Sequence, residues 1–235
     1  MRYRVLAFDY DETLAMGGRL SPLAAEALAE AARAGWRLVL VTGRPRDEIA
    51  AICTPLDLFD LVVSENGCIL HRPADGAEEV LAAGPVGTLR DLLTAAGVDF
   101  IAGRVVTITR RAEEPRVRRL LERRALPFEC FGNRPALMIV PRGASKATGL
   151  SAALERLGVA PRETVAVGDD ENDLSMFETA GLRVAVGNAV EAVKSAADLV
   201  LEAPNGEGVA AFVRKCVAGD LPIASPGRGR GEAIQ

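Results

Sequence analysis

Acidic residues follow two apolar runs of this sequence. One run leads directly into Asp9 and Asp11, and another leads into Asp169, with Asp173 shortly after it. Short apolar runs of this kind predict buried strands, and the carboxyl ends of parallel strands meet at one edge of a sheet. Carboxylates that converge there repel one another unless a cation lies among them. Hard oxygen ligands favour Mg2+ or Ca2+, and Mg2+ suits a small set of carboxylates that a substrate phosphate completes.

Two other positions near the same predicted edge could hold an anion. Thr42 and Gly43 end a third apolar run, and the backbone N–H groups after them could bind phosphate oxygens at a helix start. Lys146 lies near the start of another predicted helix, where the helix dipole favours an acidic residue, so its position favours a functional role. Phosphoryl transfer needs a nucleophile, an acid, a metal site and an anion clamp. The residues alone therefore predict that chemistry.

The composition excludes several other functions. A net charge of −4 and a pI near 5.3 do not fit a nucleic-acid-binding protein, which would be basic overall or along one face. His71 is the only histidine, so a site with several histidine ligands is impossible, and we expect it to be an exposed residue at a strand end. The cysteines form no CxxC pair, which indicates core thiols rather than disulfides or a zinc site; they are Cys53, Cys68, Cys130 and Cys216.

Nothing in the sequence indicates a membrane partner. No apolar run approaches the length of a membrane span, and acidic residues occur too early for a signal peptide. We therefore expect a cytoplasmic protein in a reducing compartment.

The two ends of the chain alternate between strand-like and helix-like segments. The predicted strands are 3–8, 36–43, 60–67, 163–170, 182–187 and 198–202, and the predicted helices are 21–35, 45–53, 145–158, 171–181, 189–197 and 208–218. A hairpin is expected over 67–82, with its turn at Asp75-Gly76. Strands separated by helices predict an α/β fold with a doubly wound, Rossmann-like parallel sheet.

The middle of the chain has a different pattern. A helix at 85–96 and a strand pair at 98–110 are followed by a helix at 113–125 and a strand pair at 127–141. Two such units predict an antiparallel sheet with helices on one face, which is an α+β cap domain inserted into the α/β domain. We place the α/β domain at 1–82 and 143–218, the cap at 83–142, and a Gly-, Pro- and Arg-rich tail, expected to be disordered, at 219–235.

Four motifs resemble those of the haloacid dehalogenase superfamily phosphatases. The sequence DYDET at 9–13 matches the DxDxT signature, Thr42 in LVTGR matches the second motif, Lys146 the third, and GDDENDLSMF at 168–177 the fourth. All four occur in the family's order, and the resemblance covers about 1–82 and 143–215. The position of the cap resembles the Cof-like (IIB) branch, which includes archaeal phosphoglycolate phosphatases, sucrose-phosphate phosphatases and sugar phosphatases.

The resemblance implies a role for each of these residues. Asp9 is the expected nucleophile, which forms an aspartyl phosphate and binds Mg2+ through its other oxygen. Asp11 is the expected general acid and later the general base, and its backbone carbonyl is expected to reach the metal. Lys146 offsets negative charge, while Thr42 and Gly43 bind the phosphoryl group.

The fourth motif is expected to complete the metal site. Asp169 is implied as a direct ligand, and Asp173 as a ligand either directly or through water. Asn172 would orient the phosphate or a carboxylate. Asp170 and Glu171 fit the first turn of a helix better, because the helix dipole favours acidic residues there.

Three other positions keep open roles. Glu12 departs from the family pattern, in which many relatives have glycine, and adds an acidic side chain whose direction the sequence leaves open. Thr13 has either a functional role or only a hydrogen bond within its loop. The pair Asn66-Gly67 either forms a turn into the hairpin or faces the cap, and we favour the turn.

The cap has an unusual excess of arginine. Residues 85–142 contain eleven arginines, no lysine and six acidic residues, a net charge of +5, so the rest of the chain carries −9. A basic cap over an acidic metal site suits an anionic substrate. Arg104, Arg110 and Arg134 are the candidate contacts, whereas a solvent-exposed helix face is expected for Arg116, Arg118, Arg119, Arg123 and Arg124.

These observations predict an enzyme, a Mg2+-dependent phosphatase that acts on a small phosphorylated metabolite of the phosphoglycolate or sugar phosphate type. A phosphomutase of the phosphomannomutase type is an alternative, because it has a related core and cap. A non-catalytic receiver-like module, phosphorylated on an aspartate, is a third possibility, but such a module needs no inserted cap.

Overall fold

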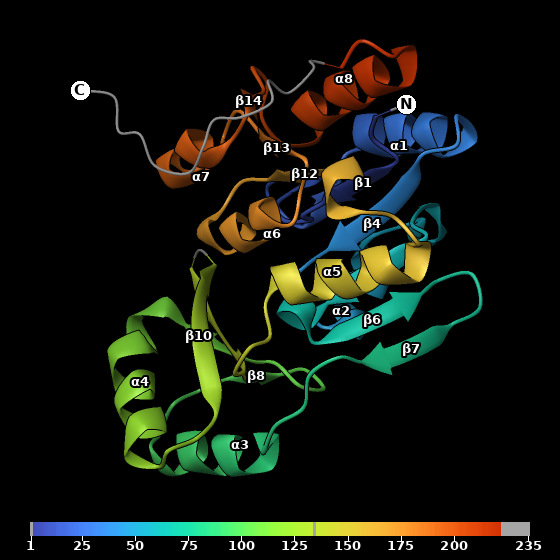
Figure 1. The fold of residues 1–235 in the computed structure, drawn as a ribbon. Coiled ribbons are helices and arrows are strands. Elements are labelled where there is room, and N and C mark those ends of the chain that lie inside the picture. Colours follow the sequence, from blue (N-terminus) through green and yellow to red (C-terminus); the bar gives the residue numbers. More distant parts are fainter. Residues whose placement is uncertain (1, 134, 222–235) are drawn as a thin grey trace.

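Two β-sheets organise the chain, and different parts of the sequence build them (Figure 1). The computed structural model describes residues 2–133 and 135–221. Eight strands form the larger sheet in the order β14-β13-β12-β1-β4-β5-β6-β7, and four strands form the smaller one in the order β10-β11-β9-β8. We call residues 83–142 the cap, and the other described residues the core module.

The larger sheet is parallel except at one side. Its parallel strands are β1 (Val5–Phe8), β4 (Arg37–Val41), β5 (Leu61–Ser64), β12 (Thr164–Gly168), β13 (Leu182–Ala185) and β14 (Leu199–Val200). The predicted hairpin, β6 (Ile69–Arg72) and β7 (Ala77–Val80), adds antiparallel strands beside β5. The predicted α/β fold with a Rossmann-like sheet is therefore confirmed.

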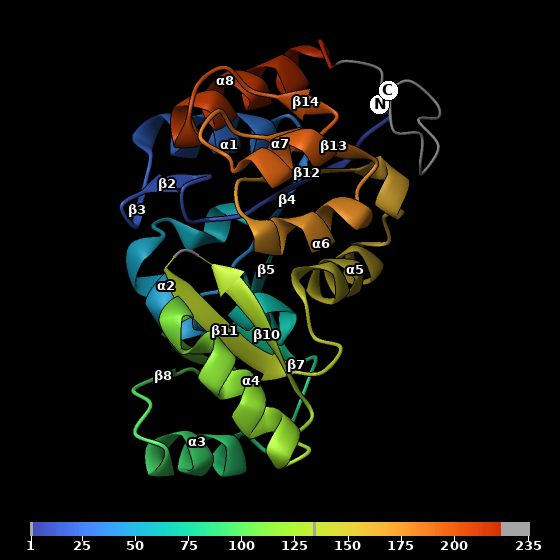
Figure 2. The same cartoon turned by 90° about the vertical axis from the view of Figure 1, so that its left-hand side faces the viewer.

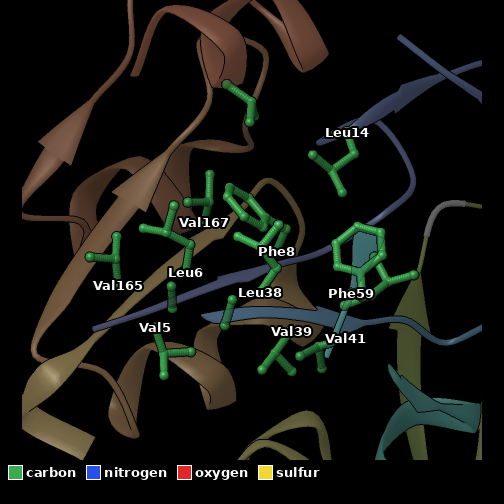
Figure 3. Packing of buried hydrophobic residues seen from close by; sticks show 14 of the residues in the cluster. Val5, Leu6, Phe8, Leu14, Leu38, Val39, Val41, Phe59, Val165 and Val167 are labelled. Carbon is green, nitrogen blue, oxygen red and sulfur yellow. The ribbon is translucent and has the colours of Figure 1, made fainter. Parts of the chain in front are cut away.

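Helices cover both faces of this sheet, as its apolar strands require. Helices α1 (Pro22–Arg33) and α8 (Asn205–Ala218) pack together on one side, and α5 (Lys146–Leu157) and α6 (Leu174–Glu178) pack on the other (Figure 1). The other α-helices described in the core module are α2 (Arg46–Ile52) and α7 (Glu191–Ala196). Buried side chains of the central strands interdigitate between these layers, among them Leu6, Phe8, Val39 and Val167 (Figure 3).

The cap is a small antiparallel sheet with two helices (Figure 2). Its strands are β8 (Ile101–Ala102), β9 (Thr107–Arg110), β10 (Phe128–Asn133) and β11 (Ala136–Pro141), and its helices are α3 (Val86–Ala95) and α4 (Glu114–Arg123). The helices bury an apolar cluster of their own against the sheet, which includes Leu89, Val117 and Ile139. A second cluster joins the cap to the core module and includes Ile69, Val106 and Met138.

Two local features differ from the sequence-based expectation. A hairpin of β2 (Ala15–Met16) and β3 (Arg19–Leu20) was not expected, and its turn uses Gly17 and Gly18 at φ values of 58° and 76°. The single helix expected over 171–181 begins instead as a 3-10 turn, Glu171–Asp173, before α6.

The prediction that His71 is exposed is wrong. Only 5% of the residue is accessible, because β6 lies between β5 and β7, and His71 pairs with Val62 and Glu78 on the two sides. Burial lowers the pKa of the imidazole, and the positive charge of Arg46 lowers it further. We therefore expect a neutral histidine at pH 7.

The cysteine prediction agrees with the structure. All four thiols are free, and three of them, Cys53, Cys68 and Cys216, are buried. Among the described residues, no helix has the length and the apolar character that crossing a bilayer requires. Helix α8 is followed by Gly219 in a left-handed conformation, and most of the tail predicted at 219–235 lies outside the described residues.

Candidate active site

Three carboxylates meet at the carboxyl ends of adjacent strands. Asp9 directly follows β1, Asp169 directly follows β12, and Asp173 ends the 3-10 turn beyond β12. Because β1 and β12 are paired in parallel, Asp9 and Asp169 leave the sheet side by side. One oxygen of each carboxylate lies within 4.8 Å of the other two, and all three residues are at least 95% buried. We call these residues the carboxylate cluster.

Lys146 inserts an ammonium group into this cluster. It is the first residue of α5, whose start is fixed by a capping box between Ser145 and Thr148. Its Nζ donates to Oδ1 of Asp9 at 2.5 Å and to Oδ1 of Asp173 at 2.6 Å, and only 1% of the residue is exposed. The structure therefore brings together four of the residues that the sequence motifs indicated.

Further hydrogen bonds orient the carboxylates. The second oxygen of Asp173 accepts from the backbone N–H groups of Asp169 at 2.9 Å and Asp170 at 3.1 Å. Thr13 donates its hydroxyl to Oδ1 of Asp169 at 2.8 Å. Thr13 therefore orients a carboxylate of the cluster and does not only form a hydrogen bond within its own loop. Asp170 accepts from the N–H of Glu171 and starts the 3-10 turn, as its first-turn position predicted.

The charges of the cluster do not balance, since three carboxylates surround one ammonium. Burial raises the pKa of Asp9 well above its ordinary value, and Asp173 and Asp169 raise it further against the opposing charge of Lys146. Burial and the charge of Asp173 raise the pKa of Asp169 to about 7, although the hydrogen bond from Thr13 opposes this shift. Burial alone would lower the pKa of Lys146, but Asp173 and Asp9 outweigh it, so its pKa is raised. A dication offsets the excess negative charge, and oxygen ligands suit Mg2+. The residues therefore fit a divalent metal.

The side chain of Asp11 lies outside this cluster. Both of its oxygens accept from the guanidinium of Arg44, at 2.7 Å each, and the carboxylate is 26% exposed. Arg44 also forms an ion pair with Glu48. The sequence argument did not select Arg44 as a site residue, although it lies within the second motif. Where the carbonyl of Asp11 lies relative to a metal stays a prediction.

The cap lies directly over the second motif. Thr42 is fully buried, and its hydroxyl accepts from the N–H of Arg44 at 3.2 Å. A Cβ atom on Gly43 would overlap Cε of Met138, a residue of β11 in the cap, and would lie 3.7 Å from Nδ2 of Asn133. A side chain at position 43 would therefore require the end of the Met138 side chain to move away. The sequence offered no signal for Met138 or Asn133 as neighbours of Gly43.

Two buried amide side chains have polar atoms without a partner among the described residues. They are Nδ2 of Asn172 and both Nδ2 and Oδ1 of Asn66. An unpaired buried polar group is costly, so these atoms are candidates for contact with a bound molecule. The side chain of Glu12, in contrast, accepts from the N–H of Gly17 at the surface and supports the β2–β3 hairpin.

Two of the three candidate arginines of the cap have acidic partners already. Arg104 pairs with Glu78 of β7, and Arg110 is exposed and lies 3.7 Å from Glu113. Arg134 lies outside the described residues. The five helix arginines expected at the surface, Arg116, Arg118, Arg119, Arg123 and Arg124, are all exposed.

The sequence argument missed one arginine of the cap. Nη2 of Arg111 lies 3.8 Å from Oε2 of Glu171, in the turn that connects Asp170 with Asp173. Its Nε also contacts Glu114 at 2.9 Å. Arg111 directly follows the strand β9. Its approach to Glu171 depends on how the cap packs on the core module, which the sequence alone does not reveal.

Comparisons with known proteins show what this chain is similar to. A family model described as haloacid dehalogenase-like hydrolase matches residues 6–100 and 121–213. A phosphoglycolate phosphatase of Methanothermobacter thermautotrophicus is 33% identical over 222 residues, which cover 90% of this chain and 98% of the relative. A phosphoglycolate phosphatase of Pyrobaculum neutrophilum is 34% identical over 218 residues, which cover 88% and 93% of the two chains.

Solved structures share the whole architecture, cap included. A haloacid dehalogenase-like hydrolase from Bacteroides thetaiotaomicron superimposes with a TM-score of 0.79 and 26% identity, over 91% of this chain and 99% of the other. A structure described as a HAD subclass IIB sugar phosphatase has a TM-score of 0.75 and 22% identity, over 93% and 100% of the two chains, and shares the fold.

Proposed function

Because this chain belongs to the haloacid dehalogenase-like hydrolases and is a phosphatase, we propose that it hydrolyses a small phosphorylated acid with Mg2+ through an aspartyl phosphate on Asp9. The observation that carries the proposal is the buried contact of Lys146 with both Asp9 and Asp173, beside Asp169. This cluster carries excess negative charge at the place where a phosphate dianion must bind. Because a cation that binds with the phosphate would offset both charges, the cluster is suited to metal-dependent phosphoryl transfer.

Asp9, Asp169 and Asp173 would hold the metal, together with the backbone carbonyl of Asp11. Bound Mg2+ would supply positive charge that offsets the carboxylates and the phosphate oxygens. Lys146 adds a second, fixed positive charge, because its ammonium contacts the proposed nucleophile directly. Thr42 and Gly43 lie at the carboxyl end of β4, where they would bind the phosphoryl oxygens. Asn172, with its unpaired buried amide, would orient the same group.

In the first half-reaction, an oxygen of Asp9 attacks phosphorus. The bond from phosphorus to the ester oxygen breaks, and the leaving oxygen takes a proton from Asp11. Both oxygens of Asp11 accept from Arg44 in the present arrangement, so Asp11 must give up at least one of these bonds to act as an acid. In the second half-reaction, water attacks the phosphorus of the aspartyl phosphate and passes a proton to Asp11. The bond between phosphorus and Asp9 breaks, which releases phosphate and restores the carboxylate.

Phosphoglycolate is the substrate that we propose first. The two relatives described above, which match 90% and 88% of this chain, carry that name. The close approach of Met138 to Gly43 favours a small leaving group, and an arginine-rich cap favours one with a negative charge. A sugar phosphate is the second substrate class. The names of the relatives favour hydrolysis over a phosphomutase reaction, and membership in a hydrolase family disfavours the receiver-like alternative.

The test is phosphate release by the purified protein from phosphoglycolate, several sugar phosphates and p-nitrophenyl phosphate. We expect hydrolysis that requires Mg2+ and stops in excess EDTA, with the largest kcat/KM for phosphoglycolate. Hydrolysis that continues undiminished in EDTA would refute the metal assignment. A larger kcat/KM for a sugar phosphate would replace phosphoglycolate, and transfer of phosphate within a sugar would instead support the phosphomutase.

A further inference from the structure

Glu65 is a buried acidic residue that the proposed reaction does not use. It directly follows β5 in the core module, and only 1% of it is exposed. Its partners are three backbone N–H groups of the cap, those of Arg104 at 2.8 Å, Val105 at 2.7 Å and Val106 at 2.8 Å. A buried carboxylate is very unfavourable unless such hydrogen bonds replace water. The cap loop between β8 and β9 therefore provides the solvation of a charge that belongs to the core module.

The cap loop has the shape that this contact needs. A Cβ atom on Gly103 would lie 2.7 Å from Cγ1 of Val106 and 2.8 Å from Oε1 of Glu65, so a side chain at position 103 would force one or both of them to shift. On the other side, the guanidinium of Arg90 in α3 donates to the carbonyls of Gly103 at 2.8 Å and Val106 at 3.1 Å. The loop is thus fixed to its own helix through its carbonyls and to the core module through its N–H groups.

The turn that carries Glu65 also contacts the candidate active site. Glu65 and Asn66 have φ values of 53° and 57°, a backbone conformation that costs on the order of 1 kcal/mol or more per residue outside glycine. The N–H of Asn66 donates to the carbonyl of Thr42 at 3.0 Å. A Cβ atom on Gly67 would overlap the carbonyl of Ser145, which precedes Lys146. One strained turn therefore contacts the cap, the second motif and the start of α5.

We propose that Glu65 is the positioning residue that sets the cap over the active site. It fixes the loop at 104–106 relative to Thr42 and thereby holds the neighbouring β11, with Met138, against Gly43. Its kinetic consequence rests on the proposed function, because the cap recognises the leaving group of the phosphate ester. Loss of the hydrogen bonds between Glu65 and the cap loop should impair recognition of the leaving group more than it impairs the chemistry of the carboxylate cluster.

An ion pair between the cap and the core module provides a matched control for the buried contact of Glu65. Glu78 of β7 pairs with the guanidinium of Arg104, whose side chain is 59% exposed. It joins the same cap loop to the same core module, but solvent screens it, so its removal should change KM by less than about twofold. Glu65 and Glu78 thus differ in burial and in the type of donor, and Glu78 also lies 3.3 Å from Nε of Arg46 in the core module.

The experiment compares Glu65→Gln with Glu78→Gln and the wild-type protein. In Glu65→Gln, the amide side chain offers one acceptor oxygen for three N–H groups, so we expect faster hydrogen exchange at the amides of 104–106. We also expect KM for phosphoglycolate to rise by about tenfold or more, since hydrogen bonds to a charged group are lost. The KM for p-nitrophenyl phosphate, which has no carboxylate for the cap to recognise, should change much less. If Glu65→Gln does not fold, Gly103→Ala displaces the same carboxylate from the cap side and takes its place.

The proposal is overturned if a folded Glu65→Gln exchanges its 104–106 amides at the wild-type rate. It is also overturned if exchange increases while the ratio of the two KM values stays unchanged, or if Glu78→Gln has the same effect. A wild-type protein that hydrolyses p-nitrophenyl phosphate but not phosphoglycolate would refute the proposed substrate alone. The role of Glu65 would then be decided by comparing Glu65→Gln with the wild-type protein in two measurements. These are the hydrogen-exchange rates of the 104–106 amides and the KM for the metabolite that the wild-type protein does hydrolyse.

Discussion

The carboxylate cluster and the arginines of the cap both carry many charges, but the charges of the cluster are buried and those of the cap are largely exposed. In the cluster, Asp9, Asp173 and Lys146 are buried, and each contacts another charged group directly. In the cap, arginines such as Arg110 and Arg118 are more than half exposed and pair with acidic neighbours of their own module. Buried charges that lose a partner are strongly destabilised, whereas exposed pairs contribute little. We therefore expect substitutions in the cluster to change the chemistry, and substitutions in the cap to change recognition.

The largest effect is expected for Asp9→Asn. The amide is nearly the same size but is a much weaker nucleophile and removes a metal ligand, so kcat should fall by about four orders of magnitude or more. Loss of one like charge should also raise the melting temperature of the metal-free protein. Asp57→Asn, at an exposed position, is the control. Substantial activity in a folded, pure Asp9→Asn would rule out covalent catalysis through this residue.

Lys146→Met should have the second largest effect. The variant keeps most of the side-chain length but leaves Asp9 and Asp173 without their shared ammonium. A fixed charge of this kind typically contributes about a hundredfold or more in rate, so kcat should fall by that factor. Lys215→Met, at the surface of α8, should match the wild-type protein. Near-normal kcat/KM in Lys146→Met would make this residue structural.

The buried carboxylates of the cluster, unlike the exposed arginines of the cap, should make metal binding depend on pH. The pKa of Asp169 is about 7 in the metal-free fold and near 3.8 in the unfolded chain, so between these values the folded state binds more protons. The stability of the metal-free protein should therefore fall as pH rises from about 4 to 7. Mg2+ must displace that proton, so its affinity should rise by up to about tenfold per pH unit below 7.

Thermal unfolding in EDTA and in Mg2+, measured across this pH range, tests that prediction. The increase in melting temperature that Mg2+ produces should be larger at pH 8 than at pH 6. An increase of equal size at the two pH values would contradict a protonated carboxylate in the metal-free cluster.

The smallest effects are expected in the cap. Arg111→Ala should raise KM for phosphoglycolate by about threefold to tenfold, because Arg111 faces the turn at Glu171, and a guanidinium suits a carboxylate. Arg104→Ala and Arg110→Ala should have smaller effects, since Arg104 is paired with Glu78 and Arg110 is exposed. Turnover of p-nitrophenyl phosphate should be unchanged in all three. A cap variant that lowers kcat for both substrates equally would contradict the division between chemistry and recognition.

The sequence alone predicted the parts of the site that follow from local pattern. Asp9 and Asp169 could be placed together because each ends an apolar run, and parallel strands end at one edge. Lys146 could be selected because its charge opposes the helix dipole at the start of α5.

Other parts depend on which elements become neighbours. His71 is buried in a strand that lies between β5 and β7, and those pairings are not encoded at His71 itself. Glu65 fell within the strand expected at 60–67, and nothing in the sequence indicated that N–H groups of the cap loop bind its carboxylate. Consecutive non-glycine residues with positive φ often mark a functional turn, but only the structure reveals those angles at Glu65 and Asn66.

The central claim is that Asp9 carries the phosphoryl group during turnover. The most direct test is to quench the working enzyme in acid, treat it with borohydride, which reduces an aspartyl phosphate to homoserine, and locate the product by peptide mass spectrometry. We predict homoserine at position 9 when Mg2+ and phosphoglycolate are both present, and none in EDTA or in Asp9→Asn. Homoserine at a different aspartate, or rapid hydrolysis with none at position 9 under conditions that trap a known acyl phosphate, would contradict the account.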